Sequence, residues 1–89
     1  MQMAYEFDPV KNKLNLEKHG LPLSEVEGFD WEVAVINEDK RATYAEARFE
    51  AISLIEDRLH VLVFCIRGEA VRVISLRKAN AREVKRYAT

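Results

Sequence analysis

The sequence contains few of the residues on which disulfide, metal and cofactor sites depend. Its 89 residues include three glycines, a single cysteine (Cys65) and two histidines (His19 and His60) that lie far apart. One cysteine cannot close a disulfide within the chain, and two distant histidines without a cysteine pair do not give the ligand spacing of a zinc site. Neither a glycine-rich phosphate loop nor a nucleophile elbow is present. We therefore expect no metal and no cofactor.

Long hydrophobic runs and a targeting leader are also missing. No apolar stretch is long enough to cross a bilayer, and no basic segment followed by an apolar run and a small-residue cleavage site begins the chain. With a single cysteine, which suits a reducing compartment, these features predict a cytoplasmic protein with no membrane partner. Apolar residues make up 48% and charged residues 33% of the chain, which is typical of globular proteins. We expect one domain over residues 1–89.

Charge is unevenly distributed along the chain, although the formal total is only −1. Residues 25–57 contain three basic and ten acidic residues, whereas residues 58–89 contain eight basic and two acidic residues. A basic C-terminal third can attract a polyanion or an acidic partner. An uneven solvated surface would have the same composition, so composition alone leaves both interpretations open.

Helix signals occur near both ends of the chain. Asp8 and Pro9 favour a helix start and Gly20 a helix end, so the first helix is predicted to end near His19. Val10 and Leu14 lie four residues apart and are predicted to face the core. A shorter helix is predicted over residues 22–28. The last is predicted over residues 80–88, where Asn80 and Glu83 resemble a capping box.

Strand patterns fill the middle of the chain. Strands are predicted over residues 4–7, 32–37, 47–55, 59–67 and 70–77, with a polar turn over residues 37–40. The run 59–67 is apolar on both faces, which favours a central strand, and Gly68-Glu69 predicts a tight hairpin after it. The predicted fold is α+β: N-terminal helices packed on an antiparallel sheet of three or four strands, with a C-terminal helix.

Basic side chains concentrate on the predicted C-terminal hairpin and helix, where arginine forks suit phosphate groups but also serve solubility. His19 suits a general acid or base, yet a histidine at a helix end also caps carbonyls. Tyr87 could stack on a base, donate a proton, or anchor the last helix to the sheet. Such groups suffice for metal-free RNA cleavage, in which the substrate's own 2′-hydroxyl is the nucleophile.

Two stretches form a recognisable pattern in order and spacing. The first contains Phe7-Asp8-Pro9, Lys11, Asn15 and Lys18-His19-Gly20; the second contains Arg72-Val73-Ile74-Ser75-Leu76-Arg77-Lys78-Ala79, Arg82-Glu83 and Arg86-Tyr87. Together they resemble the BrnT family, the toxin half of a bacterial type II toxin–antitoxin pair, over essentially the whole chain. The resemblance implies a RelE-like fold and a metal-independent endoribonuclease that inhibits translation. It also implies a cognate antitoxin, the ribbon-helix-helix protein BrnA, which neutralises the toxin and binds operator DNA.

The resemblance and the basic residues together give the candidate site. The candidate catalytic residues are His19, Glu46, Arg48, Arg67, Arg72, Arg77 and Tyr87. The candidate RNA-binding residues are Lys11, Lys18, Lys78, Arg82 and Arg86. Asn15, Ser75 and Glu83 also match the family pattern.

Two other functions stay open. Leu23, Ser53 and Leu76 stand where the family usually has phenylalanine, glycine and alanine, and the net charge is slightly negative. The chain could therefore be a catalytically weak or inactive toxin homologue that binds the antitoxin and modulates its operator binding. Direct DNA binding by this chain is less well supported, because no helix-turn-helix pattern or basic arm is present.

Overall fold

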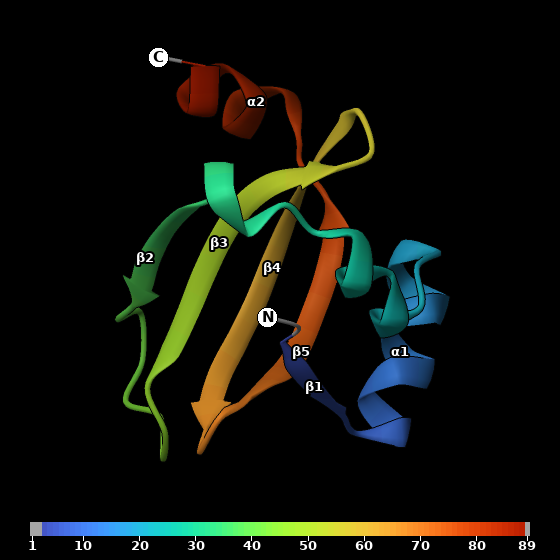
Figure 1. The fold of residues 1–89 in the computed structure, drawn as a ribbon, viewed down its shortest axis with the longest axis vertical. Coiled ribbons are helices and arrows are strands. Elements are labelled where there is room, and N and C mark those ends of the chain that lie inside the picture. The colour runs from blue at the N-terminus through green and yellow to red at the C-terminus, as the bar shows by residue number, and fades with distance from the viewer. Residues whose placement is uncertain (1–2, 89) are drawn as a thin grey trace.

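The computed structural model of the protein describes residues 3–88 (Figure 1). Its strands are β1 (Ala4–Phe7), β2 (Val35–Asp39), β3 (Arg48–Ile55), β4 (Arg58–Arg67) and β5 (Ala70–Lys78). Its helices are α1 (Pro9–His19), α2 (Ala81–Ala88) and the short 3-10 helices η1 (Leu23–Gly28) and η2 (Trp31–Val33). The predicted α+β class is confirmed. Within the described range no helix is long and apolar enough to span a membrane.

The five strands form one mixed sheet in the order β1-β5-β4-β3-β2. The strands β2 to β5 pair antiparallel in sequence order, and β4 is central, as predicted. The prediction of a purely antiparallel sheet of three or four strands is wrong, because β1 adds a parallel edge strand along β5 from Ala4–Ala70 to Phe7–Val73. Parallel neighbours need a long connection, and here the rest of the domain lies between them in sequence.

The short helix predicted over residues 22–28 is present, and the strand predicted after it needs correction. The segment after Pro22 is a 3-10 helix, and Trp31–Val33 forms a second one, where Asp30 Oδ1 accepts a hydrogen bond from the Glu32 amide at 3.1 Å. The strand predicted over residues 32–37 therefore begins later, and β2 runs to Asp39 through the predicted polar turn. The β4–β5 hairpin is confirmed: Gly68 has a φ of +59° in the turn between Arg67 and Ala70.

The ends of both α-helices are built as the sequence predicts. Asp8 accepts a hydrogen bond from the Val10 amide at 2.9 Å, and Gly20, with a φ of +73°, ends α1. At α2, Asn80 and Glu83 form a reciprocal capping box with two side-chain-to-backbone bonds of 2.9 Å. These bonds satisfy amides that a helix start leaves without partners.

Asn15, not an apolar side chain, holds α1 against the sheet. The predicted core residues Val10 and Leu14 are 65% and 58% exposed, so that prediction is wrong. Asn15 is buried, and its side chain pairs with the backbone of Leu76: Nδ2 donates to the carbonyl at 2.8 Å and Oδ1 accepts from the amide at 3.0 Å. The strand β1 ends opposite Val73, so it does not reach Leu76. The side-chain amide of Asn15 supplies the hydrogen bonds that a neighbouring strand would give to the Leu76 backbone.

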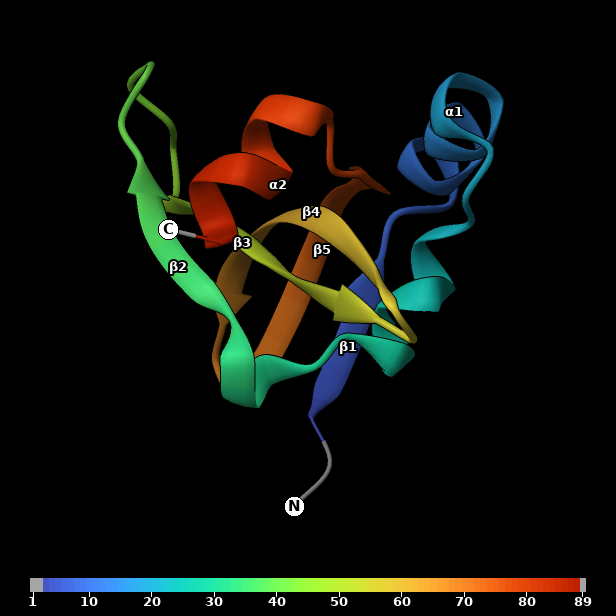
Figure 2. The ribbon, with the colours of Figure 1, turned by 90° about the horizontal axis from the view of Figure 1, so that it is seen from above.

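The two faces of the sheet have different surroundings. Figure 1 shows η1 and η2 in front of the sheet, and Figure 2 shows α1 and α2 on the opposite side. The packed face, covered by η1 and η2, consists of Phe49, Ala51, Leu62, Phe64, Val71, Val73 and Leu76, which form one core cluster with Leu23, Val26 and Phe29. The opposite face, called the open face, contains Arg48, Glu50, Ile52, Val61, Val63, Cys65, Arg72, Ser75 and Arg77. Near α2, Ile52 and Val61 of this face are buried in a second, smaller core cluster with Ala79.

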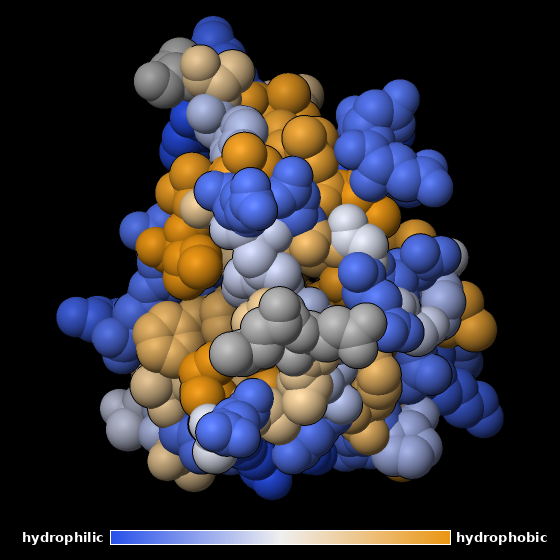
Figure 3. Space-filling view, in the orientation of Figure 1, coloured by the Kyte–Doolittle hydropathy of each residue, from blue (hydrophilic) through white to orange (hydrophobic). Residues whose placement is uncertain are grey.

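Much of the acidic middle of the chain lies on the side of the packed face. Its acidic residues in and beside η1, η2 and the β3–β4 turn are Glu25, Glu27, Asp30, Glu32, Glu56 and Asp57. Figure 3 shows hydrophilic and hydrophobic surface mixed on this side, with hydrophobic surface toward β2, where Val35 and Ile36 are about half exposed. The uneven charge along the sequence is therefore also uneven in space, with these carboxylates away from the open face.

Candidate RNA-binding face

A β-bulge in β5 determines which basic side chains reach the open face. Val63 pairs with Ser75 and Phe64 with Val73, so Ile74 is an extra residue without a partner on β4. Side chains alternate along a regular strand, so residues 72 and 77 would point to opposite faces. The bulge shifts the alternation by one residue. Arg72 and Arg77 therefore both lie on the open face.

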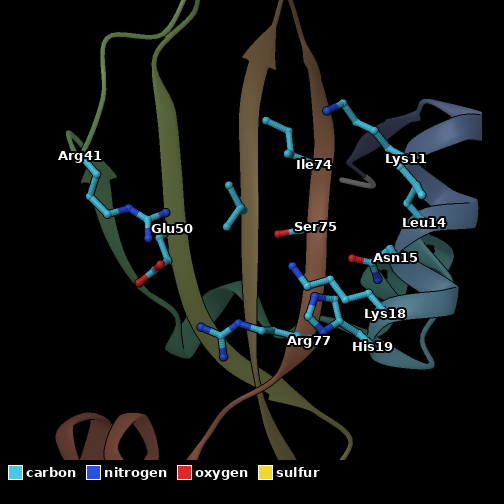
Figure 4. Close-up of a pocket in the computed structure, with 11 residues that line it drawn as sticks. Lys11, Leu14, Asn15, Lys18, His19, Arg41, Glu50, Ile74, Ser75 and Arg77 are labelled. Atoms are coloured by element: carbon cyan, nitrogen blue, oxygen red, sulfur yellow. The ribbon is translucent and has the colours of Figure 1, made fainter.

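Two adjoining cavities occupy the open face beside α1. The larger, of about 370 Å³, is bordered by α1, β3, β4 and β5, and the smaller, of about 200 Å³, lies toward the loop 40–47. They share Lys11 and Ile74. Their basic lining residues are Lys11, Lys18, Arg41, Arg48, Arg67, Arg72 and Arg77, joined by His19, and their acidic lining residues are Glu46 and Glu50. Figure 4 shows the larger of the two cavities. The seven basic residues outnumber the two acidic ones in the lining, and carboxylates just outside it (Glu6, Asp39 and Glu83) pair with three of the arginines. The excess of positive charge along the lining attracts a polyanion.

Arg77 is held by a carboxylate from α2. Its two terminal nitrogens donate to the two carboxylate oxygens of Glu83, each at 2.7 Å. The Arg77 guanidinium lowers the pKa of Glu83 to about 2, and the Asn80 amide contributes to the same shift. In turn the Glu83 carboxylate raises the pKa of Arg77. This bidentate pair fixes α2 to β5 and places a guanidinium at one end of the larger cavity.

The arginines of the smaller cavity are held less tightly. Arg67 donates to Glu46 at 2.6 Å, and both side chains are largely exposed. Arg72 lies 3.4 Å from Glu6 of β1 and 3.9 Å from Asp8. Arg48 stacks on Tyr44, with its guanidinium carbon 4.4 Å from the ring centre. The predicted residues Glu46, Arg48, Arg67 and Arg72 are thus brought together.

His19 and the lysines of α1 form the opposite wall. Lys11 and Lys18 have no ion pair with any carboxylate in the part of the chain that the structure describes, so both ammonium groups can receive an anion. His19, the last residue of α1, lines the larger cavity. Burial lowers its pKa, and the positive charges of Lys18 and Arg77 lower it further. Its imidazole is therefore mostly neutral at neutral pH.

Four predicted residues lie outside the two cavities. The Tyr87 hydroxyl donates to the Val33 carbonyl at 2.6 Å, which anchors α2. Tyr87 and Arg86 line a third cavity, between α2, β2 and β3, which shares Glu50 with the larger cavity. Lys78 pairs with His60 on the other side of the sheet, and Arg82 lies on α2. His60 is buried, with its Nδ1 2.8 Å from the Arg58 carbonyl oxygen, as expected for a structural histidine.

Two cavity residues escape the sequence-based prediction. Glu50 lines the larger cavity from β3, where its alternation with Arg48 was the available signal. Arg41 reaches the same cavity from the loop after β2, held by two bonds of 2.9 and 2.8 Å to Asp39. Nothing in the local sequence distinguishes Arg41 from a solvated loop arginine.

Comparison with known families identifies the family of the chain. Residues 7–83 match the family described as the ribonuclease toxin BrnT of type II toxin–antitoxin systems. The chain belongs to the BrnT family. The match begins at the end of β1 and ends in α2, so it includes every residue that lines the two cavities. The family resemblance seen in the sequence is confirmed. The family is one of ribonuclease toxins from type II toxin–antitoxin systems. None of the curated proteins compared with the chain matches it.

Proposed function

We propose that this BrnT family member is an endoribonuclease that binds and cleaves RNA on its open face and thereby inhibits translation. The observation that supports this most directly is the gathering of seven lysines and arginines and one histidine around two adjoining cavities. Cations arranged along a groove bind the phosphates of a single strand. We also propose that the fold is RelE-like, as the family resemblance implies.

The proposed reaction needs no metal ion. The 2′-hydroxyl oxygen attacks the adjacent phosphorus and the bond from phosphorus to O5′ breaks, which leaves a 2′,3′-cyclic phosphate and a 5′-hydroxyl. We propose that Arg72, Arg77 and Lys11, which line the two cavities, neutralise charge on the phosphate oxygens and that His19 transfers a proton. Because the Tyr87 hydroxyl is already bonded to a backbone carbonyl, we assign Tyr87 to anchoring α2.

The partner and the compartment follow from the same proposal. A type II toxin has an antitoxin, and we propose a BrnA-like ribbon-helix-helix protein that neutralises this chain and alone contacts operator DNA. We propose that the pair acts in the cytoplasm, where the RNA substrate is found.

Cleavage of single-stranded RNA in the presence of EDTA tests the proposal. The purified chain, with and without ribosomes, should leave 2′,3′-cyclic phosphate and 5′-hydroxyl ends. It should not cut a DNA strand of the same sequence, which lacks the nucleophile. Arg72→Ala and His19→Ala variants that stay folded should cut far more slowly, by about 100-fold or more. Normal cutting by both would refute the site, and an inactive wild-type chain would refute the activity.

RNA binding can be tested apart from cleavage by comparing two lysines of α1. Lys11 lines both cavities and Lys13 lines neither. On a 2′-O-methyl RNA, which cannot be cut, Lys11→Ala should reduce the slope of log affinity against log salt by about 0.7, the value for one phosphate contact to a single strand. Lys13→Ala should leave the slope close to that of the wild-type chain. Equal effects would mean that RNA does not use the groove.

A second function is favoured by one observation. The three arginines of the C-terminal hairpin, Arg67, Arg72 and Arg77, are each already bound to a carboxylate of the same chain. A toxin homologue with occupied arginines would cut RNA weakly and act as an antitoxin-binding co-regulator of operator binding. In that case expression without the antitoxin would not arrest growth, while the purified complex would still form and bind the operator.

A further inference from the structure

Glu50 differs from the other carboxylates around the open face. Glu46, which also lines a cavity, is bound to Arg67, and Glu83 is bound to Arg77. Glu50 has no hydrogen bond or ion pair with any described residue, and it lines the larger cavity. Together with the carboxylates hydrogen-bonded to them, its negative charge raises the pKa of Arg41 and of Arg77, which line the same cavity. A carboxylate that faces these cations without a hydrogen bond opposes the binding of a phosphate, so its presence there needs a different explanation.

The position of Glu50 suits a reaction on a phosphate held over the sheet. Glu50 of β3, Val63 of β4 and Ser75 of β5 lie in one row across the open face. Adjacent strands lie about 4.8 Å apart, so roughly 10 Å separate the β3 and β5 backbones in this row. Figure 4 shows Glu50 on one side of the cavity and His19 on the other, with Ser75 between them. That spacing leaves room for a phosphodiester.

In-line displacement requires groups on opposite sides of the phosphorus. The attacking 2′-oxygen enters opposite the departing 5′-oxygen, so the proton acceptor and the proton donor must stand on opposite walls of the site. Glu50 and His19 meet this requirement, and Arg77 lies at one end of the same cavity. Its guanidinium can bind the non-bridging oxygens of the phosphate while Glu50 and His19 transfer the protons.

We propose that Glu50 accepts the proton of the attacking 2′-hydroxyl and that His19 donates a proton to the departing 5′-oxygen. The proposal rests on the proposed ribonuclease activity. One proton moves from the 2′-oxygen to the Glu50 carboxylate and one from His19 to O5′, while the bond from the 2′-oxygen to phosphorus forms and the bond to O5′ breaks. Carboxylates act as bases near neutrality, and imidazolium is the group that can donate there.

The surroundings of His19 determine the pH range over which it can act as the donor. Burial and the charges of Lys18 and Arg77 lower its pKa. A lower pKa makes the imidazolium a stronger acid, although a smaller share of the molecules carries it at neutral pH. Cleavage should therefore become slower as pH rises through the lowered pKa of His19.

The first test compares Glu50→Gln with Glu38→Gln. Both changes remove one carboxylate from neighbouring strands, but Glu38 pairs with Phe49 and so belongs to the packed side of the sheet. Glu50→Gln should slow RNA cleavage by about 100- to 10,000-fold while binding 2′-O-methyl RNA at least as tightly as the wild-type chain. Glu38→Gln should cut at the wild-type rate. Bound RNA also shows that the Glu50 variant is folded.

The second test separates the proton acceptor from the proton donor. In an RNA whose scissile 5′-oxygen is replaced by sulfur, the leaving thiolate needs no proton. His19→Ala should regain most of its activity on this substrate, whereas Glu50→Gln should not. Rescue of Glu50→Gln instead would reverse the two roles and overturn the assignment. If the wild-type chain cuts RNA and Glu50→Gln cuts equally well, the assignment alone fails; if the wild-type chain cuts no RNA with or without ribosomes, the proposed activity fails with it.

Discussion

The packed face and the open face are built from the same strands but serve different ends. On β4, Leu62 and Phe64 point into the packed core, where the Trp31 ring lies 5.3 Å from Phe64 and 5.0 Å from Phe29. Val63, between them, points to the open face and lines the larger cavity. The period of two along a strand lets one segment carry both kinds of residue. Burial of apolar side chains on the packed face stabilises the fold. This stability offsets the repulsion between the basic side chains that lie close together on the open face.

The difference between the faces is sharpest in β5. Val73 and Leu76 face the core although they are three residues apart, and Arg72 and Arg77 face the groove although they are five apart. In a regular strand, residues an odd number of positions apart point to opposite faces. One bulge between them brings them to the same face, as observed for both pairs. The bulge at Ile74 therefore serves core and site together, and the contrast between the faces can be tested by changes on either side of it.

The largest effect is expected from adjacent residues of β4 that face opposite sides. Leu62→Ala should lower the free energy of unfolding by about 3 kcal/mol, because Leu62 is fully buried and the cavity left behind cannot close. Val63→Ala should cost about 1 kcal/mol or less, since Val63 faces a cavity open to solvent. Urea unfolding of both variants measures the difference. Equal losses would mean that Val63 is packed as tightly as Leu62, in contrast to the structure.

A somewhat smaller loss is expected at the contact between α1 and the sheet. Asn15→Ala removes the partner of the buried Leu76 amide and carbonyl, which should cost about 2–3 kcal/mol of unfolding free energy. It should also weaken RNA binding, because α1 carries Lys11, Lys18 and His19. Val10→Ala on the same helix should change stability by no more than about 0.5 kcal/mol, since Val10 is exposed. A larger loss at Val10 than at Asn15 would contradict the way α1 is docked.

Local patterns in the sequence predicted much of this architecture. The cap at Asp8, the glycines that follow α1 and β4, the capping box of α2 and the central position of β4 each depend on neighbouring residues, and each is found. The parallel pairing of β1 and the docking of α1 depend on residues about sixty positions apart in sequence. The apolar spacing of Val10 and Leu14 gave the wrong face, because a polar side chain makes the decisive contact.

The candidate site was predicted only in part, because it too depends on residues that are far apart in sequence. Motifs and charge identified Lys11, His19, Arg72 and Arg77, but a sequence without an alignment does not show that Ile74 forms a bulge and brings the two arginines to one face. It also placed Glu46 among the catalytic candidates. The ion pair of Glu46 with Arg67 and the position of Glu50 near Arg41 and Arg77 depend on how the loop before β3 and the strands β3, β4 and β5 lie beside one another.

The smallest of these effects depends on pH and concerns the pair of Arg77 and Glu83, which lies on the side of the open face. The folded chain holds the pKa of Glu83 at about 2, below its ordinary value of 4.5. A lowered carboxyl pKa stabilises the folded state above the ordinary pKa, and this contribution disappears as pH falls toward 2. Glu83→Gln should therefore cost about 2 kcal/mol at neutral pH and progressively less below about pH 4.5. Urea unfolding at a series of pH values checks this.

The coupling between Arg77 and Glu83 can be measured with a double variant. Because the two side chains act as a unit, Arg77→Gln combined with Glu83→Gln should lower the free energy of unfolding by less than the sum of the single changes. Additive losses would show that α2 is held to the sheet without this pair.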